Sequence, residues 1–565
     1  MSTASALNLL WMVKCTKESW AFRRATRRVA QTQATVLEEI LSRNRDTKYG
    51  RRCGFGSIHT PRDFQARVPV TSYADYACAI ERIAAGEQNV LTAERVHLLE
   101  PTSGTTGGQK LVPFTPSLRR QFQRAVAAWM ANLLWHRPGI RRGRAYWSIS
   151  PALGENRRTA GGIRIGFDDD AAYLGRLEQF VLRRLLAVPQ SITRITDIQA
   201  FRYATLYFLL RAEDLTLMSV WSPTFLTALL SPLEEWQDRL CTDIQHGTLS
   251  YSSAVPEGVS RRFAAHCSPD SRRAVYLKSV FRANSLLAEK LQQIWPRLSL
   301  ISCWTDAAAR RFVPALRDMF PTVEIQPKGL LATEGCVSFP LIERAAPALA
   351  VRSHFFEFQE TESSDDPRIR LAHELEKDGR YRVILTTGGG LYRYDLHDEV
   401  KVIGFENQCP LLRFLGKTDR VSDLVGEKLA ETHVREVLDD LFSEMGLRPE
   451  FALVVPVEGR PSHYRLYLQD SQLTDGASAT RSLEARLEVG LHTNPYYRQA
   501  IQLGQLDPID LVLLSPNGKS AWSLYEERLM SFGQKAGSIK PAALDGQLGW
   551  VEVFESANHS ALQRS

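Results

Sequence analysis

Hydroxyl residues and glycines alternate before a lysine in the segment Pro101–Lys110, which reads Pro-Thr-Ser-Gly-Thr-Thr-Gly-Gly-Gln-Lys. Glycine allows a backbone to adopt positive φ and to approach a ligand closely, and successive N–H groups in such a loop can surround an anion. The hydroxyls of Ser103, Thr105 and Thr106 add donors for phosphate oxygens, and Lys110 adds a positive charge. The segment therefore predicts a polyphosphate site, most simply for ATP, although the same residue types also form ordinary surface turns.

This loop is not a Walker loop, which needs a glycine, four residues, and then Gly-Lys-Ser or Gly-Lys-Thr. The triplets at Gly416–Thr418 and Gly518–Ser520 supply the second half of that motif, but Leu411 and Leu513 stand where the first glycine belongs. This argues against P-loop kinases and GTPases.

A carboxylate follows the predicted strand Val323–Gln326, in the segment Gly329-Leu-Leu-Ala-Thr-Glu-Gly335. Open α/β sheets place ligand groups at the ends of their strands. Glu334 at such a position is suited to hold Mg²⁺ that bridges ATP oxygens. We therefore expect Thr333 and Glu334 to lie at a site for nucleotide and magnesium.

Two further acids, Asp395 and Asp398, come after the predicted strand Tyr381–Thr387 and the glycine triplet Gly388–Gly390. Both are candidates to accept hydrogen bonds from ribose hydroxyls. A hairpin with a charged turn explains the same residues without a ligand, with Val400–Phe405 as its second strand.

The elements around the phosphate loop follow from the apolar pattern. Apolar residues at helical spacing predict one helix from about Lys17 to Tyr49. Arg95–Leu99 has the content of a short buried strand, and a helix is expected from Leu118 to Leu134. The resulting order of strand, loop and helix would present backbone N–H groups of a helix N-terminus to phosphate.

The middle of the chain predicts a parallel sheet. Residues Leu174–Leu230 are mostly helical in pattern, with a strand at Leu217–Trp221. A strand at Ser299–Trp304, a helix at Ala307–Met319 and the strand Val323–Gln326 then alternate. Such alternation indicates an α/β fold with a parallel sheet.

A domain boundary is expected near Gly416–Arg420. Beyond it the pattern predicts a helix at Thr432–Leu441, a hairpin of Phe451–Val457 with Tyr464–Leu468, a helix carrying Leu483, Leu487 and Leu491, and a strand at Ile509–Leu514. We therefore predict a large domain of residues 1–418 and a small α+β domain of residues 419–565, with a hinge at about 416–423.

Composition excludes several classes of protein. The 44% hydrophobic and 24% charged residues are typical of a soluble globular protein, and the net charge of +7 is spread without a basic run, so nucleic-acid binding is not expected. The eight cysteines stand singly, which argues against a zinc ribbon and agrees with a reducing cytoplasm. No apolar stretch is long enough for a membrane span, and Leu7–Val13 is too short for a convincing signal peptide.

Four collinear segments resemble one family: Thr102–Lys110, Leu331–Glu334, Gly390–Asp398 and Asp423–Glu431. Together they resemble the plant auxin-responsive Gretchen Hagen acyl-acid amido synthetases, and more closely their bacterial relatives, within the adenylate-forming, firefly-luciferase-like superfamily. The resemblance runs from about residue 30 to the C-terminus. It implies a large adenylation domain with mixed sheets and helices, a small mobile C-terminal domain, and a monomer.

The resemblance also implies roles for individual residues. Thr333 would lie near the adenine and α-phosphate, Glu334 near Mg²⁺, and Asp398 at the ribose. Lys428 would reach the α-phosphate from the domain junction. Lys540 matches the late lysine-proline element of the family and is predicted to be catalytic, although Ala542 follows Pro541 where the family usually has arginine. The residues expected at the ATP phosphates are Thr102, Ser103, Gly104, Thr105, Thr106 and Lys110.

The implied reaction needs no protein nucleophile. A carboxylic acid attacks ATP to give an acyl adenylate and pyrophosphate, and an amine or amino acid then displaces AMP. Loop N–H groups, lysines and Mg²⁺ supply the charge neutralisation that such steps require. Three alternatives share the fold: an acyl-CoA ligase, an ester-forming or tailoring ligase, and a degenerate adenylate-binding protein.

Overall fold

The computed structural model describes residues 3–102, 110–148, 158–166, 176–195, 197–250, 266–361, 368–418, 420–471, 473, 477–514, 519–532, 534 and 539–562. The chain divides into two compact units, each with hydrophobic cores of its own. Unit 1 comprises Met1–Thr305, Pro314–Leu396 and Val400–Phe414, and unit 2 comprises Asp306–Val313, His397–Glu399 and Leu415–Ser565. The expected boundary between residues 418 and 419, and the hinge, stay predictions.

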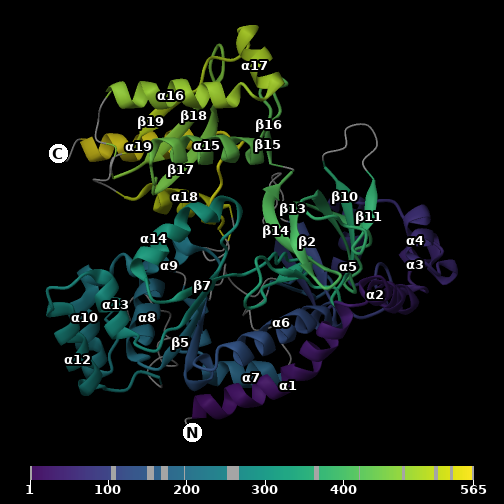
Figure 1. Ribbon diagram of the computed structural model, residues 1–565, viewed down its shortest axis with the longest axis horizontal. Helices are drawn as coiled ribbons and strands as arrows, with labels where there is room; N and C mark the ends of the chain where they lie inside the picture. Colours follow the sequence, from purple (N-terminus) through teal and green to yellow (C-terminus); the bar gives the residue numbers. More distant parts are fainter. Residues whose placement is uncertain are drawn as a thin grey trace. The chain divides into compact units, whose positions relative to one another are not determined.

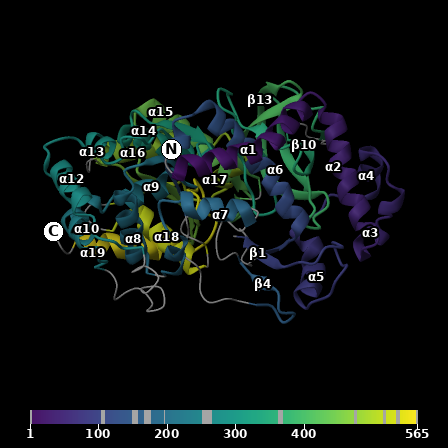
Figure 2. The same ribbon diagram turned by 90° about the horizontal axis from the view of Figure 1, so that it is seen from below.

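Unit 1 begins with helices, and the single helix expected from Lys17 to Tyr49 is wrong. The chain forms α1 (Thr3–Ala25), α2 (Val29–Asn44), α3 (Lys48–Arg52), α4 (Pro61–Arg67) and α5 (Tyr73–Ala84). The break after α1 has a tertiary cause, because the buried Thr26 accepts a hydrogen bond from the Asn407 side chain (2.8 Å) and from the Gln408 N–H (2.8 Å). Figure 2 shows α1 running along α6 (Pro116–His136) and α7 (Arg176–Leu185).

A small sheet in the order β2-β1-β4 carries the predicted phosphate loop. Strands β1 (Leu98–Thr102) and β2 (Lys110–Phe114) pair antiparallel, and β4 (Arg164–Ile165) pairs parallel with β1. The loop therefore joins two strands of a hairpin, and α6 begins only after β2. The expected order of strand, loop and helix is wrong in this respect.

The parallel sheet predicted for the middle of the chain is confirmed. It has the order β3-β5-β6-β7, and every residue of β5 and β6 is buried, which is typical of a sheet covered on both faces. Figure 1 shows the helices beside it. The strands are β3 (Arg144–Trp147), β5 (Leu215–Ser219), β6 (Leu300–Cys303) and β7 (Glu324–Pro327), and the helices are α8 (Ile198–Arg211), α9 (Pro223–Leu230), α10 (Leu233–His246), α12 (Ser271–Arg282), α13 (Leu287–Ile294) and α14 (Val313–Met319).

A second, seven-stranded sheet has the order β11-β10-β12-β13-β14-β9-β8. Its strands are β8 (Ser338–Phe339), β9 (Ala348–Leu349), β10 (Phe355–Glu360), β11 (Ile369–Leu371), β12 (Arg380–Thr386), β13 (Tyr394–Glu406) and β14 (Cys409–Lys417). Strand β13 starts at Tyr394, so Asp395 and Asp398 lie within it. They are not in the charged turn that the hairpin alternative required.

Unit 2 is an α+β arrangement, as the C-terminal pattern predicted. Strands β17 (Phe451–Val457) and β18 (His463–Gln469) form the predicted hairpin, and β19 (Asp510–Leu513) pairs parallel with β18. The unit also takes Arg311 and Phe312 from earlier in the chain: Arg311 forms an ion pair with Asp439 (2.6 Å), and the Phe312 ring lies 6.2 Å from that of Trp522. Its remaining elements are β15 (Val421–Ser422), β16 (Leu429–Ala430), α15 (Glu431–Met445), α16 (Ala477–Leu491), α17 (Pro495–Gln502), α18 (Ala521–Ser531) and α19 (Trp550–Leu562). Among the described helices of both units, none combines the length and the apolar character that crossing a membrane requires.

A buried ion pair joins three parts of unit 1. The side chains of Arg393 and Glu357 are 5% and 1% exposed, and the Arg393 Nε lies 3.1 and 3.0 Å from the two carboxylate oxygens. The same guanidinium donates to the carbonyls of Gln65 (3.0 Å) and Val68 (2.6 Å), at the end of α4. Arg393 thereby fixes β10 and α4 to the chain just before β13.

The N-terminus of α6 is capped by protein groups. The Thr115 hydroxyl accepts the N–H of Leu118 (3.1 Å) and donates to the carbonyl of Gly388 (2.9 Å). The Glu94 carboxylate accepts the N–H of Ser117 (2.6 Å) and its hydroxyl (2.8 Å). A carboxylate at this position neutralises the positive end of the helix dipole, so this helix end is not left open for phosphate.

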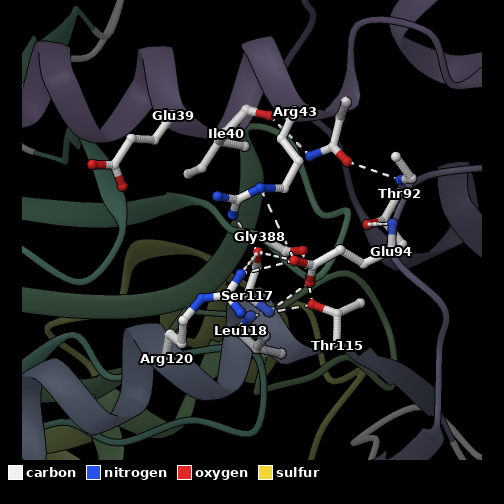
Figure 3. Close-up of polar contacts among 12 residues, drawn as sticks. Glu39, Ile40, Arg43, Thr92, Glu94, Thr115, Ser117, Leu118, Arg120 and Gly388 are labelled. Carbon is white, nitrogen blue, oxygen red and sulfur yellow. Dashed lines mark hydrogen bonds and ion pairs between the residues drawn. The ribbon is translucent and has the colours of Figure 1, made fainter.

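Two arginines complete the cluster around Glu94. Arg120 donates to a Glu94 oxygen at 2.8 Å, and Arg43 donates to the Ser117 hydroxyl. Figure 3 shows the Glu94 carboxylate between Arg43, Ser117 and Arg120. Burial alone would raise the pKa of Glu94, but the hydrogen bonds from Ser117 and Arg120 outweigh burial and hold that pKa below its usual value.

We expect Glu357→Ala to lower the free energy of unfolding of unit 1 by about 3–5 kcal/mol, because Arg393 is left buried without its partner. The double variant Glu357→Leu with Arg393→Met should lose less than the sum of the two single losses. Arg344→Ala is the control, since it breaks a partly exposed pair with Glu406 and a bond to the neighbouring Glu343 carbonyl, and it should cost less than about 1 kcal/mol. Urea unfolding gives the free energy of unfolding of each variant. A loss for Glu357→Ala no larger than that for Arg344→Ala would contradict the structural role of the buried pair.

We expect Glu94→Gln to destabilise unit 1 by about 1 kcal/mol at neutral pH, because α6 loses its anionic cap. A carboxylate whose pKa is lower in the folded protein stabilises above its unfolded pKa of about 4.3, and this stabilisation disappears as pH falls through the folded value. The difference in thermal midpoint from the parent should therefore be full at pH 7 and shrink in acid. Glu39→Gln, at a half-exposed carboxylate of α2, is the control with little effect at either pH. A gap that stays constant with pH would refute the role of the charge.

Candidate functional site

The two ends of the predicted phosphate loop lie side by side. Thr102 pairs with Lys110 in the β1–β2 hairpin, and the Lys110 ammonium lies 5.9 Å from the centre of the Tyr73 ring. The Tyr73 hydroxyl accepts the N–H of Leu111 (2.8 Å), and burial raises the pKa of that hydroxyl. The four residues between them that were predicted to bind phosphate lie outside the described residues: Ser103, Gly104, Thr105 and Thr106. Their role, and those of Thr102 and Lys110, stay predictions.

Thr333 and Glu334 form the tip of a tight hairpin in the segment between β7 and β8. Ala332 and Gly335 exchange both N–H···O bonds (3.0 and 3.2 Å), which leaves these two residues as the turn, half-buried. A Cβ atom at Gly335 would lie 2.9 Å from both His354 and Leu385. The pair lies at a hairpin tip beyond the end of β7, a strand of the parallel sheet, rather than at the strand end itself, and its role at a nucleotide site stays a prediction.

A lysine and two tryptophans, which sequence reasoning did not identify, lie at the carboxyl ends of the same sheet. The Lys328 ammonium donates to the Ser219 hydroxyl (2.6 Å) and lies 4.8 Å from the centre of the Trp221 ring. Trp221 and Trp304 have ring centres 5.5 Å apart, and all three side chains are partly exposed. Because open α/β sheets bind ligands at this edge, a cation beside flat rings here is suited to an aromatic acid. The predicted strands Leu217–Trp221 and Ser299–Trp304 both end on a tryptophan, and this shared ending is the signal that would have found the pair.

A cavity of about 710 Å³ lies elsewhere in unit 1. Its lining includes Arg144, the first residue of β3, and Arg211, the last residue of α8 before β5, so the cavity lies toward the amino ends of the sheet. Arg144 pairs with Asp214 (2.8 Å), and Arg211 donates to the Ser268 hydroxyl (2.8 Å). These arginines are therefore used within the protein.

Each of the two candidate ribose acids faces a cation. Asp398 is 3% exposed, and the Lys417 ammonium lies 3.0 Å from its Oδ1. Asp395 is paired with Arg382 at 2.9 Å. Lys417 belongs to the Gly-Lys-Thr triplet that the sequence placed only at a domain boundary, and its pairing with Asp398 could not be read from the pattern. The binding role of Asp398 stays a prediction.

Lys428 is exposed on a firmly held loop between β15 and β16, with φ of 44°. The preceding Glu427 is completely buried and accepts the N–H groups of Leu424 (2.8 Å) and Val425 (2.9 Å), together with the Tyr464 hydroxyl. Asn494, which also caps α17, donates to the Glu427 carbonyl (3.4 Å). The loop therefore presents a lysine from a fixed backbone.

Lys540 also belongs to unit 2 and is half-buried. Its carbonyl accepts the Tyr525 hydroxyl (3.1 Å), which fixes the backbone of this segment. A catalytic role for either lysine stays a prediction.

Glu334 supplies a single carboxylate as a candidate magnesium ligand. Within the described ranges, no group of three or more His, Cys, Asp or Glu side chains is placed to hold a metal ion. Mg²⁺ at nucleotide sites is commonly held by one or two carboxylates together with substrate phosphates. A single carboxylate at the hairpin tip fits that mode.

Two regions of this chain match the domains of one known protein family. Residues 19–325 match the GH3 family N-terminal domain, and residues 348–417 match the GH3 family central domain. The indole-3-acetic acid-amido synthetase GH3.3 of Arabidopsis thaliana is 25% identical over 501 residues, covering 84% of this chain and 83% of the relative.

Two solved structures share the fold. The AtGH3.15 acyl acid amido synthetase in complex with 2,4-DB has a TM-score of 0.82 at 21% identity, covering 95% of each chain. A 2-hydroxyisobutyryl-CoA ligase in its postadenylation state has a TM-score of 0.53 at 12% identity, covering 95% of this chain and 92% of the ligase. The expected fold class is therefore confirmed.

The resemblance inferred from the four collinear segments is confirmed at the level of the family. The first matching domain alone spans more than half of the 565 residues. This chain belongs to the GH3 family of acyl acid amido synthetases, ligases that form amide bonds.

Proposed function

We propose that this enzyme joins a carboxylic acid to an amine or amino acid in two steps, with ATP as the co-substrate. The acid carboxylate attacks the α-phosphorus of ATP, and pyrophosphate leaves. The amine then attacks the acyl carbon, loses a proton, and releases AMP. Membership of the GH3 family over both matched regions is the observation that carries this proposal.

The residues proposed to contact ATP come from separate elements. The Thr333 hydroxyl and the Asp398 carboxylate bind the adenosine part, and Glu334 holds Mg²⁺, which neutralises phosphate oxygens when bound. Lys428 and Lys540 stabilise the negative charge that develops at the α-phosphate. The phosphates are held by Thr102, Ser103, Gly104, Thr105, Thr106 and Lys110.

The acid is proposed to be aromatic. The relatives are named for indole-3-acetic acid, and one solved structure contains 2,4-DB. In this chain, Trp221 and Trp304 offer partly exposed rings beside Lys328 at the carboxyl edge of the parallel sheet. Stacking against rings and a nearby cation suits an aryl or indolyl carboxylate better than a short aliphatic acid.

Unit 2 is proposed to move between the two steps, with residues 416–423 as the hinge. The division of the chain into two units, with Lys428 and Lys540 both in unit 2, supports this proposal. A hinge absorbs its change of φ and ψ over a few residues. Because Lys428 and Lys540 both come after residue 423, they would move with the C-terminal stretch and act mainly in the first step.

We expect ATP–pyrophosphate exchange that depends on Mg²⁺ and on one class of acid in a panel of indolyl, aryl, fatty and hydroxy acids. With the active acid, adding amino acids should yield an amide and AMP, whereas coenzyme A should yield no thioester. Mass spectrometry of the products decides between amide, ester and thioester. Thioester formation in place of amide would overturn the amido synthetase assignment, and ATP binding without exchange would favour a binding-only protein.

We expect Lys428→Ala to lower the exchange rate by about 10²–10³-fold, because one charge-neutralising donor is lost. The same variant, supplied with chemically prepared acyl adenylate, should transfer the acyl group to amine at close to the parent rate. Lys519→Ala is the control, since Lys519 is also exposed in unit 2 but forms a surface ion pair with Glu527. Near-normal exchange by Lys428→Ala would refute the role of this lysine.

A further inference from the structure

His354 is a completely buried histidine that no step of the proposed reaction uses. It comes just before β10, between the rings of Phe122 and Phe356, each 5.9 Å away and close to perpendicular. Gln33 of α2 fixes its backbone by donating to the His354 carbonyl (2.9 Å) and accepting the Phe356 N–H (2.8 Å). The imidazole therefore has one position and one orientation.

One ring nitrogen of His354 holds the hairpin that carries Thr333 and Glu334. The N–H of Cys336, two residues after the tip, donates to Nε2 at 3.0 Å. Gly335 packs against the same ring so closely that any side chain there would collide with Nε2. The histidine thus contacts the closing arm of the hairpin by a hydrogen bond and by direct packing.

The other ring nitrogen connects the hairpin to α6 and to the glycine loop before β13. Because Nε2 accepts a backbone N–H, the ring proton lies on Nδ1, which donates to Gln121 Oε1 at 3.1 Å. The same Gln121 oxygen accepts the N–H of Gly388 at 2.9 Å. Four residues far apart in the sequence thereby form one chain of hydrogen bonds: Cys336, His354, Gln121 and Gly388.

The chain of bonds requires a neutral ring. Burial, with a smaller effect from the positive charge of Arg124, lowers the pKa of His354 to about 3. A protonated ring would turn Nε2 into a donor and remove the acceptor that Cys336 needs. The surroundings of His354 therefore keep the acceptor in place throughout the neutral pH range.

We propose that His354 is a positioning residue for the nucleotide, which sets the place of Thr333 and Glu334 through its hydrogen bond to Cys336. This inference rests on the proposed function, because it is the ATP contact of the hairpin tip that gives the positioning its use. Gln121 and Gly388 orient the imidazole and fix the hairpin relative to α6. Both His354 and Gln121 are buried, so they act through the backbone that they hold.

Two variants of equal polarity separate positioning from stability. In His354→Gln the amide oxygen reaches the place of Nε2 and can still accept the Cys336 N–H, while the donor toward Gln121 is lost. In His354→Asn the amide nitrogen replaces Nδ1 and still reaches Gln121, while no atom reaches Cys336. Both place a polar amide in a buried site, so their thermal midpoints should fall by similar amounts.

The measurements are the dissociation constant for ATP with MgCl₂ and the hydrogen exchange of the Cys336 amide in the protein without ATP. We expect His354→Asn to weaken ATP binding about tenfold or more and to speed exchange of this amide, because one hydrogen-bonding contact between the hairpin tip and ATP is worth about tenfold in affinity. His354→Gln should stay within about threefold of the parent in both. Equal ATP affinity in the two variants would overturn the inference while leaving the proposed function intact. Failure of the parent protein itself to bind ATP would overturn both.

Discussion

The ion pair between Arg393 and Glu357 is the interaction on which the arrangement of unit 1 depends. An arginine with positive φ, a buried glutamate and two carbonyls at the end of α4 meet at one point, so the N-terminal helices and the seven-stranded sheet share a fixed joint. A buried pair of this kind adds little net stability over apolar residues, but its geometry has to be satisfied completely. It therefore selects one arrangement of β10, α4 and the start of β13, where the candidate ribose acids lie.

The same device recurs at smaller scale at three other places, two of them beside candidate ATP contacts. Glu94 accepts the first free N–H of α6, Glu427 accepts two N–H groups before Lys428, and His354 accepts one beside Thr333 and Glu334. Glu427 and His354 are completely buried and the Glu94 side chain is 20% exposed, and each replaces hydrogen bonds that the backbone would otherwise make with water. Since a buried unpaired N–H is costly, each acceptor restricts its turn to one conformation. Rigid turns of this kind suit a site whose work is to position and neutralise charge.

Sequence reasoning reached the regular elements because their signals are local. The strands β5, β6 and β7 of the parallel sheet and the hairpin Phe451–Val457 with His463–Gln469 follow from apolar runs and turn residues, whereas β3 was not predicted. The order around the phosphate loop was predicted wrongly, since Lys110–Phe114 is too short and too mixed to indicate a strand by itself. Contacts between distant segments, such as Lys417 with Asp398 or His354 with Cys336, leave no periodic trace in a single sequence. The positions of Thr333 and Lys428 in their motifs were readable, but the side chains that hold them were not.

The segments that make up unit 2 determine whether it can be separated from the rest of the chain as a fragment. Unit 2 is discontinuous: besides the C-terminal stretch it takes Asp306–Val313 and His397–Glu399. A fragment ending at residue 418 keeps Arg311 and Phe312 without Asp439 and Trp522, and the complementary fragment lacks the first pair. The C-terminal stretch is thus not a transferable module. A single crossover that exchanges that stretch between related enzymes would work only if the residues at 306–313 and 397–399 match the new stretch. We therefore expect substitutions in these two earlier segments to accompany substitutions in the C-terminal stretch.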